Sequence, residues 1–191
     1  MKQSLILSST LAIILLMASC SKDKTVTPSQ PVTKTKDITV NFSSSTPFTL
    51  FSFKDTSVIA NSDSISGKWD FALRLTTFLV NSHSGGPGNA GVIVEDGVFD
   101  NILIAPASGY AYDTTTTQRA IKDGSWYDYN PTTHSFVPKA GKLFIFRTGD
   151  GTHYVKMELL SANYVPFTGP VPQQIIYKMR FTYQPDGTTK F

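Results

Sequence analysis

The sequence holds one cysteine, Cys20, and three histidines among its 191 residues. A single cysteine excludes a disulfide within the chain and any zinc site built on several cysteines. Charged residues make up only 16% of the chain, and the formal net charge is +3 at pH 7. So balanced a charge does not suggest nucleic-acid binding, and a domain without disulfides must depend on its hydrophobic core.

Motifs of common catalytic sites are missing as well. The chain contains no Gly-x-Ser-x-Gly and no His-Glu-x-x-His sequence, which serine hydrolases and zinc proteases use. The sequence therefore predicts a protein that is not an enzyme. One alternative is an enzyme whose two carboxylates meet in space, as in glycoside hydrolases. The candidates for such a pair are Asp70, Glu95, Asp96, Asp128 and Glu158.

A short basic start precedes fifteen almost uninterrupted apolar residues, Leu5–Ser19. At 1.5 Å per residue this run would form a helix of about 22 Å, shorter than the roughly 30 Å hydrocarbon core of a bilayer. The run is therefore interpreted as a lipoprotein signal peptide over residues 1–19. Ala18 and Ser19 directly before Cys20 match a bacterial lipobox. This pattern predicts that Cys20 is lipidated and anchors the chain to the outer membrane, on its surface or its periplasmic face.

Residues 20–36 are rich in Thr, Ser, Pro and Lys, and Val26 and Val32 are the only aliphatic residues after the cysteine. Such a segment buries too little apolar surface to offset the entropy of ordering. We therefore expect a lipidated flexible tether over residues 20–36, followed by one β domain over residues 37–191.

From Asp37 onward the sequence pattern is typical of strands. "IIYKMRFTYQ" near the end has apolar residues at every second position, as a strand buried on one side requires. "GKLFIFRT" and "HYVKMELLS" flank Gly149–Gly151, which predicts a hairpin. No window shows a 3.6-residue apolar stripe longer than about two turns. The sequence thus predicts an all-β fold of antiparallel strands in a sandwich-like or open-barrel domain.

His83 lies in a glycine-rich loop, "NSHSGGPGNAG", over residues 81–91. A phosphate-binding loop needs a Gly-Lys-Ser/Thr sequence that leads into a helix. Here the loop has no lysine and a strand pattern follows it. The loop is therefore interpreted as a connection between strands, with contact to a ligand as the alternative.

His134 follows a cluster of aromatic residues that includes Trp126 and Tyr129. A neutral imidazole beside aromatic side chains could face a flat apolar ligand and coordinate haem iron. The alternative is an exposed turn histidine at the edge of the core. His153 follows a Gly-Asp-Gly turn and is expected to be an exposed polar residue. Met157 and Met179 lie in strand patterns and are expected in the core.

Three stretches resemble the HmuY family of Bacteroidetes lipoproteins: "KWDFALRLTTFLVNSHSGGPGNAG", "WYDYNPTTHSFVPKAGKLFIFRTGDGTHYVKMELLSANY" and "KMRFTYQPDG". The resemblance covers residues 37–187. It implies an all-β fold and a haemophore-like function, with haem captured at the cell surface by two histidines or, in other members, by methionines. Residues 112–125, where the family's first histidine ligand would lie, contain neither His nor Met, and Asn130 and Pro131 occupy the place of the second.

From the residues and the resemblance we expect a lipoprotein that binds haem, or a similar flat apolar ligand, for iron or haem acquisition. His134 and His83 are the candidate axial ligands, and Trp126 and Tyr129 are the expected aromatics of the cleft. No metal other than haem iron is expected. An outer-membrane receptor is a further expected partner. The alternative is a binding module of the same fold that takes a glycan or a protein partner and has lost haem ligation.

Overall fold

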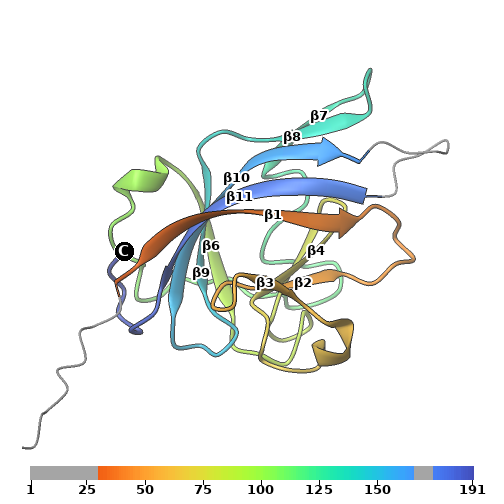
Figure 1. Cartoon of the computed structure of the whole chain (residues 1–191). Coiled ribbons are helices and arrows are strands. Elements are labelled where there is room, and N and C mark those ends of the chain that lie inside the picture. The colour runs from red at the N-terminus through yellow and green to blue at the C-terminus, as the bar shows by residue number, and fades with distance from the viewer. Residues whose placement is uncertain (1–29, 166–173) are drawn as a thin grey trace, which may run out of the picture.

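Antiparallel strands form three sheets in the computed structural model, which describes residues 30–165 and 174–191 (Figure 1). The largest sheet has five strands in the order β1-β11-β10-β9-β6. Its strands are β1 (Val32–Asn41), β6 (Gly91–Asp96), β9 (Lys142–Arg147), β10 (Tyr154–Tyr164) and β11 (Gln174–Gln184). The expected all-β, antiparallel fold is confirmed. The expected signal peptide, Cys20 and residues 21–29 of the expected tether lie outside the described residues.

A second sheet and a separate hairpin complete the domain. The second sheet has the order β3-β2-β4-β5, and β7 pairs only with β8. These strands are β2 (Thr49–Ser52), β3 (Ser57–Ile59), β4 (Phe71–Arg74), β5 (Thr77–Val80), β7 (Tyr127–Asn130) and β8 (Ser135–Pro138). Two short 3-10 helices, η1 (Asn61–Asp63) and η2 (Phe99–Asn101), interrupt the connections. No helix in residues 30–165 and 174–191 is long and apolar enough to cross a membrane.

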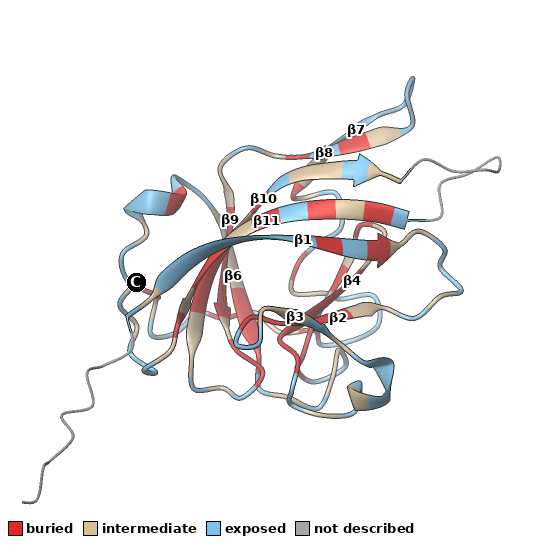
Figure 2. Ribbon diagram, viewed as in Figure 1, coloured by how far each residue is buried: buried red, intermediate tan, exposed pale blue. Residues whose placement is uncertain are grey.

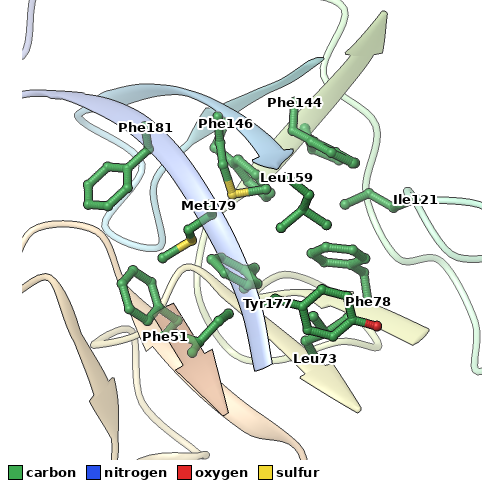
Figure 3. Close-up of a cluster of buried hydrophobic side chains, with 14 of the residues drawn as sticks. Phe51, Leu73, Phe78, Ile121, Phe144, Phe146, Leu159, Tyr177, Met179 and Phe181 are labelled. Carbon is green, nitrogen blue, oxygen red and sulfur yellow. The ribbon is translucent and has the colours of Figure 1, made fainter. Parts of the chain in front are cut away.

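The hydrophobic core lies between the two sheets, where the buried faces meet (Figure 2). Alternation along β11 buries Ile175, Tyr177, Met179 and Phe181 in turn, because successive side chains of a strand point to opposite faces. Met157 is buried as completely as Met179, which confirms both methionines as core residues. Figure 3 shows Met179 among aromatic side chains from both sheets.

The hairpin expected around Gly149–Gly151 is present. β9 pairs with β10 in a register that places Val155 opposite Phe146 and Met157 opposite Phe144. On the other side of β10, however, Lys156 is only 7% exposed. The loop that contains η2 covers this side, and the Lys156 Nζ donates hydrogen bonds to two of its carbonyl oxygens. The sheet is therefore covered on both faces at this point.

The start of the domain differs from the expected boundary, because β1 begins at Val32, inside the segment assigned to the tether. Residues 32–37 are exposed, yet all pair with β11. Backbone pairing, with a Thr33–Thr182 side-chain hydrogen bond of 2.7 Å, defines this part of the strand. Such pairing leaves no apolar alternation in the sequence, so the pattern could not reveal it.

Residues 68–81, "KWDFALRLTTFLVN", form β4 and β5, which are separated by a two-residue turn at Leu75 and Thr76. Leu75 has φ of 49°, a left-handed conformation that bulky residues rarely adopt. Tertiary contacts hold it there: its N–H donates to the Asn41 carbonyl (3.0 Å), and its own carbonyl accepts from the Tyr177 hydroxyl (2.8 Å). The turn is thus set by distant residues and not by local turn chemistry.

Candidate functional site

An aromatic cavity of about 340 Å³ opens where the β7–β8 hairpin lies beside the end of β1 and the β4–β5 turn. Its walls come from five separate places in the sequence, and five of its eight lining residues are aromatic. The lining residues are Phe42, Leu75, Thr76, Tyr127, Tyr129, His134, Phe136 and Tyr164. Ligand cavities in proteins measure roughly 300–1,000 Å³ and are mostly apolar with a few polar groups. This cavity has that size and chemistry.

The β7–β8 hairpin presents the polar groups of the cavity. Tyr129 pairs with Phe136 across the hairpin, and the side chain of Asn130 accepts hydrogen bonds from the N–H groups of Thr132 and Thr133 in the turn. His134 closes the turn with φ of 52°. Histidine adopts this left-handed conformation more readily than most residues. The turn therefore depends on local hydrogen bonds, and it returns His134 to the side of Tyr129.

Two tyrosines hold His134 at the cavity. The Tyr129 hydroxyl lies 2.9 Å from the His134 Nδ1, and the Tyr164 hydroxyl donates to the His134 carbonyl at 3.1 Å. Because Nδ1 is engaged, Nε2 is the ring nitrogen free to meet a ligand. A histidine that binds a metal through Nε2 needs an acceptor for its Nδ1 proton, which fixes the ring and its tautomer. The Tyr129 oxygen is placed to be that acceptor.

Two residues with a strained backbone conformation also line this cavity. Within residues 30–165 and 174–191, four residues other than glycine have positive φ, and two of them, Leu75 and His134, line the cavity. Residues held in such conformations cost free energy and are concentrated at ligand sites. The cavity is therefore a place where the fold maintains unfavourable local conformations.

The cavity wall is uncharged apart from any proton on His134. Its lining includes no Asp, Glu, Lys or Arg. Burial raises the pKa of Tyr127 and of Tyr164, so both phenols remain protonated at neutral pH. The Tyr127 hydroxyl is 3.0 Å from Asp123 outside the lining. Such a surface favours a neutral, flat face on the ligand over a phosphate or a sulfate.

Trp126, expected to line the cleft, lies behind it. Its side chain is 1% exposed and packs edge-on against Phe78 (5.3 Å), Tyr127 (4.9 Å) and Tyr177 (5.9 Å) between ring centroids. It supports the tyrosine wall without belonging to the lining. Of the four residues expected at the cleft, the structure therefore brings together Tyr129 and His134 and places Trp126 beneath them.

His83, the other candidate ligand, belongs to a different part of the molecule. Its ring packs against Tyr112 with a centroid distance of 5.1 Å, and it is not among the residues that line the aromatic cavity. The glycine loop around it borders a second cavity of about 280 Å³ through Gly85, beside Trp69. The loop thus forms no wall of the cavity that contains His134.

The five candidate carboxylates are dispersed. Three of them form ion pairs: Asp96 with Lys142, Asp128 with Lys139, and Glu158 with Arg180. A fourth, Glu95, is half-buried on β6. Asp70 is buried and borders a third, polar cavity of about 190 Å³ with Asp55 and Asp150. In the described parts of the chain, no group of three or more His, Cys, Asp or Glu side chains is placed to hold a metal ion.

Both oxygens of Asp70 accept backbone hydrogen bonds of 2.7 Å, from Phe53 and Gly149. These bonds tie β2 to the β9–β10 hairpin. Burial raises the pKa of Asp70 to about 6, against the lowering effect of the two N–H donors. We therefore regard Asp70 as a buried structural carboxylate.

Among the lining residues that the sequence did not predict, Phe42, Leu75 and Tyr164 lie at least 26 residues from the β7–β8 hairpin along the chain. Their assembly depends on the sheet order.

The sequence matches no protein-family profile and no curated protein. Among solved structures, the chain is similar to the crystal structure of the Tannerella forsythia apo HmuY analog. The two share 13% sequence identity with a TM-score of 0.48, over 83% of this chain and 98% of that chain. The solved protein is described as an analog of HmuY, which gives its name to the family that the sequence resembles. A likeness at this level assigns neither a ligand nor a site.

Proposed function

We propose that this chain is a lipid-anchored binding protein of the outer membrane that takes haem, or a similar flat apolar molecule, into the aromatic cavity. The observation that carries the proposal is the position of His134, held between Tyr129 and Tyr164 at the mouth of a cavity with an aromatic lining. The sequence resemblance to a family of haem-binding lipoproteins supports the same ligand. No catalytic step is proposed.

The residues present fit haem in three respects. A cavity of about 340 Å³ is near the lower end for ligand sites, so it would enclose part of a porphyrin and leave the rest at the surface. Its lining is apolar and aromatic. His134 Nε2 is a suitable donor for haem iron, with the Tyr129 oxygen accepting the proton of Nδ1. Bound haem would supply the iron, and the chain would supply the donor nitrogen and the apolar slot.

A glycan or protein partner is the second candidate. Three tyrosine hydroxyls and Thr76 line the cavity, and Tyr129 is 54% exposed. Aromatic faces with nearby hydroxyl groups also suit the apolar faces of sugars. An outer-membrane receptor that collects the ligand would be a further partner of the haem-binding form.

The test is a haemin titration of the chain from Ser21 onward, followed by the Soret band. We expect saturable binding with micromolar affinity, and we expect His134→Ala to shift the band and weaken binding. His153→Ala is the matched control, because His153 is paired with Asp150 (2.9 Å) and lies outside the cavity. Absence of any saturable Soret change would reject haem and leave the glycan or protein partner. Identical titrations of wild type and His134→Ala would reject the donor.

A further inference from the structure

The end of the domain where β1 begins is also where the chain's last residues and the η2 loop meet. The Ala105 N–H donates to the Thr189 carbonyl at 2.7 Å, and the Phe191 N–H donates to the Leu103 carbonyl at 2.9 Å. Gln30 and Pro31 border a cavity together with Lys190 and Phe191. Figure 1 shows the start of β1, the η2 coil and the C-terminus on one side of the molecule.

Residues 97–105, which we call the apolar loop, carry three exposed aliphatic side chains at this end. Val98 is 59% exposed, Leu103 62% and Ile104 61%. Such residues are common singly on protein surfaces, but three within seven positions of one loop form a patch. A patch of this kind on a surface loop indicates a contact that removes its side chains from water.

The apolar loop is not a loose segment that happens to be exposed. Phe99 and Ala105 anchor it in the core, at 2% and 1% exposure. The Lys156 Nζ donates to the carbonyls of Phe99 (3.1 Å) and Ile102 (2.8 Å) from beneath. The inner residues are thus held in place, and the fold presents the outer ones outward.

The charge of Asp100, which lies within the apolar loop, is compensated within the domain. The Asp100 carboxylate lies 3.6 Å from the Arg180 guanidinium, which also binds Glu158 at 2.6 Å. The guanidinium lies over the Phe99 ring, 4.1 Å from its centroid. The loop therefore combines apolar tips with a paired Asp100 carboxylate, and the exposed Lys190 lies opposite Ile104 in a β-bridge. Apolar side chains next to a cation suit contact with a lipid interface.

The number of residues between Cys20 and β1 limits how far the start of β1 can lie from the anchor. Nine residues lie between Cys20 and Gln30, and the ten Cα–Cα steps from one to the other span at most about 35 Å. β1 then runs for ten residues, about 30 Å, to Asn41 beside the aromatic cavity. An anchor at Cys20 therefore keeps the start of β1, next to the apolar loop, within about 35 Å of the membrane, whereas the cavity lies at the far end of β1.

We infer that the apolar loop is a membrane-contacting face, which enters the lipid interface through Val98, Leu103 and Ile104 and directs the aromatic cavity away from the bilayer. The inference rests on the anchor at Cys20 in the proposed function. Three aliphatic side chains bind membranes weakly when free. A tether makes the contact intramolecular, so that a weak affinity is sufficient.

The test uses the single cysteine and does not require natural lipidation. The mature chain is coupled through the Cys20 thiol to a maleimide headgroup lipid in phosphatidylcholine vesicles that contain acyl-brominated phospholipid. A reporter tryptophan is introduced as Leu103→Trp, with Ile104→Trp as a second reporter if the first misfolds. The native residues Trp69 and Trp126 are each 1% exposed and report a constant background.

The matched control is Ile65→Trp. Ile65 is 86% exposed and follows η1, which Figure 1 shows on the other side of the molecule from η2. We expect brominated lipid to quench the reporter at position 103, and to leave the control no more quenched than the parent chain. Adding Val98→Glu to the Leu103→Trp chain should reduce the quenching.

Three results would overturn the inference. The first is a reporter at position 103 that brominated lipid does not quench, and the second is equal quenching at positions 103 and 65. The third is a blue shift of the reporter emission that depends on protein concentration and occurs without vesicles. That shift would identify a second copy of the chain as the partner. Failure of the proposed function would be observed in different experiments, as a Cys20 that carries no lipid in cells or as a chain that does not bind haemin. Neither observation affects the coupled chain on vesicles.

Discussion

The glycine loop and the β7–β8 hairpin each present a histidine with positive φ beside a tyrosine, yet only one of them borders the aromatic cavity. His83 (φ 48°) lies against Tyr112, and His134 (φ 52°) is bonded to Tyr129. The two local arrangements are alike, and their surroundings differ. A histidine next to an aromatic residue is therefore not a site in itself, because the walls must come from other strands.

The glycine loop is closed by close packing and buried polar groups. Asn81 is fully buried, and its side chain donates to the carbonyls of Ser66 and Trp69 and accepts from the Gly88 N–H. A Cβ on Gly86 would overlap Asn81 and the Trp69 ring. The glycines thus permit close approach of backbone and side chains. The hairpin, by contrast, leaves space between its aromatic residues and the end of β1.

The largest effect is expected from adding a methyl group to the closely packed loop. Gly86→Ala should lower the free energy of unfolding by about 3 kcal/mol, because Trp69 and Asn81 must move to admit the Cβ. Denaturant unfolding measures the loss. Gly67→Ala is the control, since its Cβ would only touch the Gly149 oxygen at 3.7 Å. Similar losses in the two variants would show that the loop is not closely packed.

The two histidines can be compared directly by haemin affinity. His134→Ala should weaken binding about 100-fold, or roughly 2.7 kcal/mol, because it removes the proposed donor to iron. His83→Ala should leave the affinity unchanged, because His83 does not line the cavity. Spectrophotometric titration of both variants gives the comparison. A loss at His83 and none at His134 would reverse the assignment of the site.

The free energy of unfolding should depend on pH through the buried carboxyl of Asp70, which lies near the glycine loop. The pKa of its carboxyl is about 6 in the folded chain, against 3.8 for a solvated aspartate, so the folded state binds the proton more tightly than the unfolded one. The free energy of unfolding should therefore increase by about 2 kcal/mol as pH falls from 7 to 4. Burial raises the pKa of Asp150, but hydrogen bonds from Thr148, Thr152 and His153 outweigh it and lower the pKa to about 2. The stability that Asp150 contributes is therefore lost mostly below pH 4.

Asp70→Asn provides the control for that pH dependence. The variant should be less stable than wild type at pH 4, and the increase between pH 7 and pH 4 should disappear. Denaturant unfolding at several pH values measures both quantities. A variant that keeps the wild-type slope would assign the dependence to another group.

The smallest effect concerns the orientation of His134. Tyr129→Phe removes the oxygen next to Nδ1 and keeps the aromatic ring in the cavity. Haemin affinity should fall about tenfold, because loss of such a partner frees the ring and the tautomer. Tyr127→Phe is the control, since the Tyr127 hydroxyl is bonded to Asp123 and not to His134. Equal effects in both variants would show that Tyr129 acts only through packing.

Strand patterns predicted much of the fold because burial on one face leaves a period of two in the sequence. The β11 run and the hairpin around Gly149–Gly151 were both located in this way. The first part of β1 was not, since residues 32–37 are exposed and pair with β11 without burying an apolar face. The β4–β5 turn also escaped prediction, because Leu75 is held in its conformation by Asn41 and Tyr177.

By itself the sequence determined the all-β class, the absence of disulfides within the chain, and the short separation of five positions between Tyr129 and His134. These features depend on local period and spacing. Only the tertiary structure decided that Phe42, Leu75 and Tyr164 complete a cavity around that hairpin, and that Trp126 and His83 do not line it. The reason is physical: a cavity is bounded by side chains from separate strands, and sheet order, which sets their positions, depends on packing across the whole core.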